Sequence, residues 1–223
     1  RNNGHIDYVK QAVFLAKRIK KYLNIPVTVA TDSTDYLKDS FDIQIFDQII
    51  SLDYTDGSNL RYFFDGTLTK KTASFKNNNR ANVYNLSPYN ETLLMDTDYV
   101  ISNSLLKTVF DSSADFLIYK KSNDIAKVRD ECEFDKISDT GVDFYWATVV
   151  YFRKTDTNKT FFNLVSHIEQ EWNHYRRVYQ ITSNLFRNDF AFSIAIHIMN
   201  GFQSGNFAQQ LPGSMMYITD KDV

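Results

Sequence analysis

The chain has 223 residues, of which 43% are hydrophobic and 15% aromatic, so it can bury a sizeable core. It has only 7 glycines and 3 prolines, against roughly 16 and 11 at average usage, and none of the glycines forms a P-loop or a dinucleotide-binding fingerprint. The net charge of −2 provides no basic surface for nucleic acid. These features argue against a P-loop NTPase, a fingerprint-bearing dinucleotide fold and a nucleic-acid-binding protein.

The single cysteine, Cys132, cannot close a disulfide within the chain, which favours a reducing compartment. Glycosylation sequons occur at Asn90 and Asn158, and we interpret them as chance matches in a cysteine-poor chain. No apolar run reaches the roughly 20 residues that span a bilayer, and no signal peptide opens the chain. We therefore expect a cytoplasmic protein without a membrane span.

The first predicted elements are a helix and a strand. Apolar residues recur at steps of three and four over 6–23, the period of one helical face, and Pro26 ends this helix. Residues 27–30 follow as a short buried strand that leads to Asp32. A half-polar strand over 43–52 is typical of a sheet edge, and 53–79 is predicted as a long loop with some helix.

The rest of the chain continues the alternation of helices and strands. Residues 80–86 are predicted to be helical, and the strand 92–95 carries Asp96, Thr97 and Asp98 at its carboxyl end, where α/β sheets place ligands. The following predicted elements are strands at 116–119 and 144–152, a long amphipathic helix over 161–175 and a buried helix over 190–199 that begins near Asn188. The pattern predicts one α/β domain over 1–223, with a mixed central sheet flanked by helices.

Two Asp-x-Asp pairs occur, about the number expected by chance. Asp220 and Asp222 lie in a polar tail, where solvated charge is the simpler interpretation, whereas Asp96 and Asp98 follow an apolar strand. Carboxylate oxygens in that setting are suited to a divalent cation, which can neutralise a diphosphate.

The segment Leu93-Leu94-Met95-Asp96-Thr97-Asp98-Tyr99-Val100 resembles the strand and Asp-x-Asp motif of GT-A fold, nucleotide-sugar-dependent glycosyltransferases, particularly those of family 8 and glycogenin. Further similarities follow in order along most of the chain: an early strand that ends in Asp32, a basic residue at Arg80, the strand Tyr145-Trp146-Ala147-Thr148, and Asn188-Asp189 before an apolar helix. The resemblance implies a single Rossmann-like GT-A catalytic domain.

The resemblance also implies roles for individual residues. Asp96 and Asp98 would hold Mn²⁺ or Mg²⁺, and Arg80 would bind the diphosphate or the sugar hydroxyls. Asp189 would be the catalytic residue, as nucleophile, base or sugar-hydroxyl acceptor. The remaining residues expected to bind the nucleotide sugar are Asp32, Thr97, Trp146, Ala147 and Thr148. The partners implied are a nucleotide-sugar donor and a hydroxyl-bearing glycan, lipid or protein acceptor.

The sequence departs from the family in two places. The metal-binding His near the carboxyl end of family 8 enzymes has no counterpart in its usual setting, and nothing before Ile6 is apolar enough for the first strand of a GT-A sheet. We therefore expect the chain to lack that first strand and the C-terminal tail. His197, on the apolar helix, is interpreted as a core histidine.

Two other functions remain open. Asp96-Thr97-Asp98 also resembles the first motif of haloacid-dehalogenase-like phosphatases, with Asp96 as nucleophile, Asp98 as acid/base and Asp139 in the last acidic motif. Against this, that motif should lie on the first strand. The other alternative is a non-catalytic domain that binds a nucleotide sugar or a protein partner.

Overall fold

The computed structural model describes residues 6–53, 60–64, 70–74, 80–127 and 135–217. It is a mixed α/β structure, as predicted. Its α-helices are α1 (Tyr8–Tyr22), α2 (Thr34–Ser40), α3 (Val83–Leu86), α4 (Asp156–Gln170), α5 (Trp172–Val178) and α6 (Asn188–Met199). Short 3₁₀ helices cover Ile43–Ile45, Arg80–Asn82, Leu105–Asp111 and Ser138–Thr140.

The strands, in chain order, form several small sheets and one larger one. They are β1 (Thr28–Thr31), β2 (Gln48–Ser51), β3 (Leu60–Phe64), β4 (Lys70–Ser74), β5 (Glu91–Met95), β6 (Phe116–Tyr119), β7 (Ser122–Asp124), β8 (Lys136–Ile137), β9 (Val142–Asp143), β10 (Trp146–Arg153), β11 (Gln209–Gln210) and β12 (Met215–Tyr217).

The main sheet has the strand order β11-β6-β10-β5 and is mixed. The long strand β10 runs antiparallel to both β5 and β6, while β11 is parallel to β6. The register places Val149 opposite Met95, the last residue of β5. Asp96, Thr97 and Asp98 therefore follow the carboxyl end of β5, as predicted, and β5 is an edge strand of this sheet.

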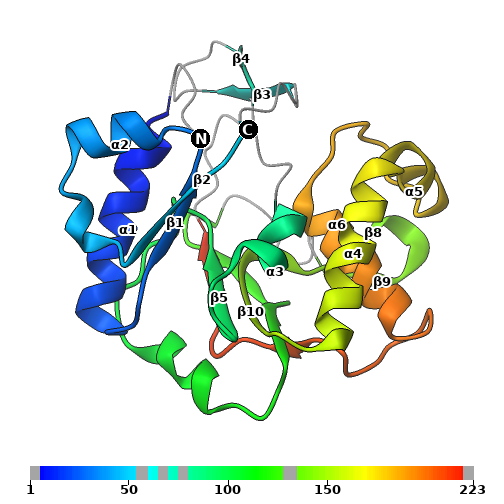
Figure 1. The fold of residues 1–223 in the computed structure, drawn as a ribbon. Coiled ribbons are helices and arrows are strands. Elements are labelled where there is room, and N and C mark those ends of the chain that lie inside the picture. Colours follow the sequence, from blue (N-terminus) through cyan, green and yellow to red (C-terminus); the bar gives the residue numbers. More distant parts are fainter. Residues whose placement is uncertain (1–5, 54–59, 65–69, 75–79, 128–134, 218–223) are drawn as a thin grey trace.

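Helices α4 and α6 pack together beside this sheet (Figure 1). Their contact with it is aromatic: the ring of Phe161 on α4 lies 4.6 Å from that of Phe116 on β6 and 5.4 Å from that of Phe192 on α6. All three side chains are almost fully buried. The aromatic content of the sequence is thus used largely in one core.

A second, smaller core joins α1 and α2 to the parallel pair β1 and β2. Figure 1 shows these elements together on the opposite side of the molecule from α4 and α6. Hydrogen bonds connect these elements to the rest of the structure: the Thr28 hydroxyl lies 2.8 Å from that of Tyr89, and Arg18 Nε donates to the Ile101 carbonyl over 2.7 Å. The predicted helix over 6–23 and strand over 27–30 are confirmed.

The structure corrects three predicted elements. Residues 43–45 form a 3₁₀ helix rather than strand, because the Asp42 side chain accepts a hydrogen bond from Gln44 N and starts a turn. Within 53–79, 60–64 and 70–74 form an antiparallel pair instead of loop and helix, in line with the β propensity of the run Tyr62-Phe63-Phe64. The long helix over 161–175 is interrupted at Glu171, and α5 starts with the buried Trp172, whose Nε1 donates to the Asn184 carbonyl.

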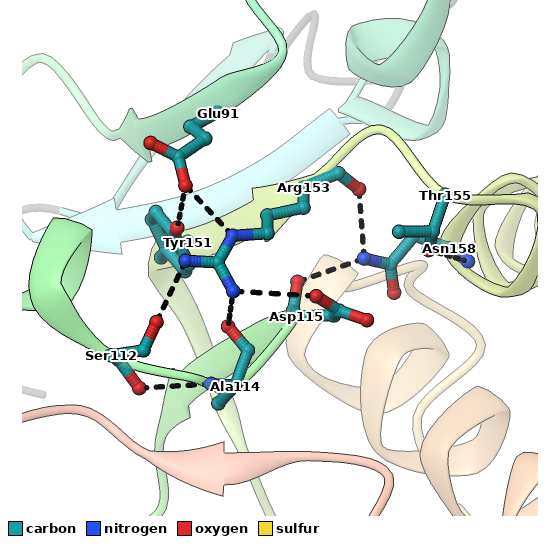
Figure 2. Close-up of polar contacts among 8 residues, drawn as sticks. All are labelled: Glu91, Ser112, Ala114, Asp115, Tyr151, Arg153, Thr155 and Asn158. Carbon is teal, nitrogen blue, oxygen red and sulfur yellow. Dashed lines mark hydrogen bonds and ion pairs between the residues drawn. The ribbon is translucent and has the colours of Figure 1, made fainter.

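A polar network holds the start of β5 to the end of β10 (Figure 2). Arg153 Nε and the Tyr151 hydroxyl both donate to Glu91 Oε1, over 2.7 and 3.0 Å. Arg153 also donates to the Ser112 carbonyl over 2.7 Å, and the fully buried Asn158 donates to the carbonyls of Asp115 and Arg153. The network lies at the end of β5 opposite Asp96, so it supports the sheet without entering the pocket described below.

No helix in the described part of the chain is both long and apolar enough to cross a membrane.

Candidate functional site

A polar pocket of about 230 Å³ lies at the carboxyl end of β5. Four separate segments build it: the 3₁₀ helix before α3, the residue after β5, the start of β10, and the start of α6. It is lined by Arg80, Asp96, Trp146, Ala147, Thr148, Arg187, Asn188 and Asp189. Six of the nine residues predicted to form the site therefore lie in one pocket.

An irregularity in β10 supplies the backbone groups that organise this pocket. Trp146 pairs with Tyr119 and Val150 with Ile118, so the residues between them bulge out of the ladder with β6. A bulge frees backbone groups from strand pairing. Here the Ala147 N–H donates to Asp189 over 2.9 Å. On the side of β10 that faces β5, the Thr148 carbonyl accepts from the Asp96 N–H over 2.9 Å, next to the pair Val149 and Met95.

The guanidinium of Arg80 is the centre of the site's hydrogen bonding. Its Nη1 forms an ion pair with Asp96, and its Nη2 donates to the carbonyls of Ala147 and, over 3.1 Å, Thr148. Only 11% of the Arg80 side chain is exposed, and its Nε has no hydrogen-bond partner among the described residues. Arg80 thus holds Asp96 against the bulge of β10. To contact a diphosphate, as predicted, Arg80 would have to use Nε or exchange one of its present hydrogen-bond partners.

Asp96 has an unusual environment for a carboxylate. Burial is the main cause that raises the pKa of Asp96 to about 6; the nearby charges of Asp98 and Asp189 act in the same direction, and the Arg80 guanidinium opposes the shift. The side chain still exposes 42% of its surface and lines the pocket. Strongly shifted pKa values in a concave site are typical of functional carboxylates.

Asp189 lies in the first turn of α6, but it does not cap the helix. The N-cap is Arg187, and Asp189 directs its side chain across to β10, where Oδ1 accepts from Ala147 N. Its Oδ2 accepts from Arg187 Nη2 over 2.7 Å. Both oxygens of Asp189 already accept hydrogen bonds. The geometry therefore favours a carboxylate that accepts a further hydrogen bond from a hydroxyl group, through its remaining lone pairs, over one that acts as a free nucleophile.

Three predicted residues lie outside the pocket. The Thr97 hydroxyl donates to Gln11 on α1 over 3.4 Å, and Asp32 accepts from the hydroxyl of Ser33 over 3.0 Å at the end of β1. Asp98 is exposed in the turn after β5, close enough to Asp96 for its charge to raise that pKa. Asp98 thus does not line the pocket, but its charge acts on Asp96, which does.

Two pocket residues were not predicted as site residues: Arg187 and Asn188. Arg187 is 32% exposed and uses one of its five donors on Asp189, so it retains donors for a bound anion. The signal available in the sequence was a cation placed directly before Asn188-Asp189.

The donor set suits a metal that a substrate helps to bind. The described residues contain no group of three or more His, Cys, Asp or Glu side chains placed to hold an ion. Mg²⁺ is commonly held by one or two carboxylates together with substrate phosphates. The exposed Asp98 and the pocket-facing Asp96 provide such a pair of hard oxygen donors.

The last acidic motif of the phosphatase alternative lies elsewhere. Asp139 is exposed in the 3₁₀ helix after β8 and does not line the pocket that contains Asp96. The proposed nucleophile, Asp96, is ion-paired with Arg80. Neither feature favours attack by Asp96 on a phosphate ester.

Comparisons with protein-family models, with curated proteins and with solved structures found no match for this chain. The pocket's own chemistry therefore carries the functional assignment.

Proposed function

We propose that the protein is a metal-dependent glycosyltransferase of the GT-A type, which moves a sugar from a nucleotide-diphosphate sugar to a hydroxyl on a glycan, lipid or protein acceptor. The observation that supports this most is the single pocket formed by Arg80, Asp96, the bulge of β10 and Asp189. These groups come from distant parts of the chain and combine cationic donors, carboxylates and an aromatic wall, as a charged sugar donor requires.

Asp96 and Asp98 would hold the Mn²⁺ or Mg²⁺. When bound, the cation would supply positive charge for the diphosphate. Arg80 keeps Asp96 in place through its ion pair and its bonds to the β10 bulge. Arg187, the N-cap residue of α6, would donate its unused N–H groups to the diphosphate. These hydrogen bonds would stabilise the negative charge that develops as the diphosphate leaves.

Asp189 and the bulge would orient the transferred sugar. A carboxylate oxygen carries two lone pairs, so Asp189 can accept from a sugar hydroxyl while it keeps Ala147 N and Arg187. The acceptor hydroxyl would attack the anomeric carbon while the bond from that carbon to the diphosphate oxygen breaks. The electron pair of the broken bond would leave on the nucleoside diphosphate, which would take up the proton of the acceptor hydroxyl.

Calorimetric titration with a panel of UDP-, GDP- and ADP-linked sugars, with and without Mn²⁺, tests the proposal. We expect one donor to bind only with Mn²⁺, and Asp98→Asn to abolish that binding. Asp139→Asn is the matched control, since it removes an exposed carboxylate outside the pocket. Binding indifferent to both metal and Asp98→Asn would contradict the proposal, and aryl-phosphate hydrolysis lost in Asp96→Asn would establish the phosphatase instead.

A further inference from the structure

A second pocket, of about 240 Å³, lies against the carboxyl-terminal half of α6. It shares no lining residue with the first pocket. Its walls come from β9 and the residues flanking it, from α6, and from the loop 200–205. They consist of Thr140, Gly141, Val142, Asp143, Tyr145, Ser193, Ile196, His197, Asn200, Phe202, Gln203, Ser204 and Gly205. His197, predicted to be a core residue, is in fact half-buried and lines this pocket.

The walls carry little uncompensated charge. Both carboxylate oxygens of Asp143 are ion-paired, one with Lys136 and the other with Lys120 over 2.6 Å. Burial lowers the pKa of His197, which favours the neutral imidazole. A charged ligand would find no unpaired counter-ion among the side chains that line the pocket.

Hydrogen-bonding groups of both kinds are nevertheless available. Burial, with a smaller effect of Asp143, raises the pKa of Tyr145 to about 12, so its hydroxyl stays protonated. Asn200 accepts from Phe207 N through Oδ1, which leaves its amide N–H groups, and Gln203 and Ser204 are exposed on the same loop. Neutral donors and acceptors arranged around a small volume suit a ligand rich in hydroxyl groups.

An exposed aromatic ring completes the pocket. Phe202 is 67% exposed and adopts a left-handed conformation, with φ of 62°, which is unfavourable for a bulky residue. Its backbone N–H donates to the His197 carbonyl over 3.0 Å, and its ring meets the His197 ring edge to face at 5.8 Å. The chain thus holds a large apolar ring in solvent, beside neutral polar groups, at a conformational cost.

From this combination we infer that the second pocket binds a neutral saccharide unit, with Phe202 stacked on the apolar C–H face of the sugar ring and the polar walls bonded to its hydroxyls. A volume of about 240 Å³ lies below the usual range for drug-sized ligands and suits one sugar ring. The inference does not depend on the proposed function. Under that function, the bound unit would belong to the acceptor glycan.

Ligand-observed NMR with the whole chain, without metal or nucleotide, tests the inference. The probes are glucose, galactose, N-acetylglucosamine and maltose, with glucuronate as the charged comparison. We expect at least one neutral sugar to bind with a low-millimolar Kd and more tightly than glucuronate. Phe202→Gly should weaken that binding about fivefold, the effect of losing one aromatic contact, without lowering the Tm, because glycine accepts a positive φ.

Phe14→Ala is the control, since Phe14 is another half-exposed aromatic on α1, away from the pocket. It should leave sugar binding unchanged. The inference fails if none of the neutral sugars binds, or if Phe202→Gly binds sugar as Phe14→Ala does. It also fails if Asp189→Asn abolishes the binding, since Asp189 lines the first pocket and the sugar would then occupy that pocket. None of these results depends on the donor titration, so the two proposals fail separately.

Discussion

Arg80 and Asp96 form an ion pair in which the arginine also binds the bulged backbone of β10. One guanidinium thereby connects the end of β5 to the point where β10 leaves its regular pairing with β6. Breaking a largely buried pair of this kind leaves a carboxylate and backbone carbonyls without partners, which is more costly than the pair's net contribution suggests.

Arg80→Lys should therefore lower the free energy of unfolding by about 1–3 kcal/mol. A lysine keeps the charge, but its single ammonium cannot replace the planar fork that reaches Asp96 and two carbonyls together. Urea denaturation at pH 7 measures the change. Arg177→Lys, at an exposed position on α5, is the control and should change stability little. Equal effects of the two variants would show that the fork geometry is unimportant.

Asp189→Asn distinguishes the contribution of Asp189 to stability from its proposed role in turnover. The amide can still accept from Ala147 N, but its NH₂ group cannot accept from Arg187, so we expect a loss of about 1 kcal/mol in stability. Donor turnover should fall about 100-fold, the scale on which removal of one positioned polar group acts. Steady-state kinetics and thermal melting measure the two effects. Unchanged turnover would remove Asp189 from the site.

Asn158→Ala should destabilise the protein by about 1–2 kcal/mol, because the fully buried side chain makes two hydrogen bonds, to the carbonyls of Asp115 and Arg153, and both are lost. Asn163→Ala, on an exposed position of the same helix α4, is the matched control and should be neutral or slightly stabilising. The comparison is made by chemical denaturation. Because Asn158 is fully buried, its sequon is closed to glycosylation in the folded chain.

Acid sensitivity should depend on Glu91. Hydrogen bonding to Arg153 lowers the pKa of Glu91 in the folded state, with Tyr151 assisting and burial opposing. A lowered folded pKa gives stability that is present above the unfolded pKa and is lost as the pH falls through the folded value. Glu91→Gln should thus be less stable than the parent at pH 7 by about 0.5–1 kcal/mol, given its exposure.

The difference between Glu91→Gln and the parent should then shrink as the pH is lowered below about 4. Urea titrations at pH 7, 5 and 3.5 measure this convergence. A difference that stays constant over that range would show that the carboxylate charge is not what stabilises the network in Figure 2.

The local pattern of apolar residues was sufficient to predict helices and strands in which the buried positions recur at a regular spacing. The apolar period over 6–23 and the apolar run before Asp96 predicted α1 and β5 correctly. Pattern was insufficient where distant segments decide the structure. The break at Glu171 accompanies the burial of Trp172 against a later loop. Residues 43–45, predicted to be part of an edge strand, instead form a 3₁₀ helix that begins where the Asp42 side chain accepts a hydrogen bond from Gln44 N.

The candidate site was also predicted only in part from the sequence. Arg80, Asp96 and Asp189 were predicted from motif order, and the structure places them in one pocket. The bulge of β10 could not be predicted, since it is a register shift between two strands, and neither could the contact of Arg187 with Asp189. His197 was assigned to the core because its helix is apolar, whereas the loop 200–205 leaves its ring beside a pocket.

Release of nucleoside diphosphate from the best-binding nucleotide sugar, with water as the acceptor of the sugar, tests the central claim most directly. It is measured by mass spectrometry with Mn²⁺ present or chelated, in the parent, Asp98→Asn and Asp139→Asn. We predict release that requires Mn²⁺, is lost in Asp98→Asn and persists in Asp139→Asn. Donor binding without release in any condition would indicate a non-catalytic sugar-nucleotide-binding domain, and release that is unaffected by chelation or by Asp98→Asn would contradict the account.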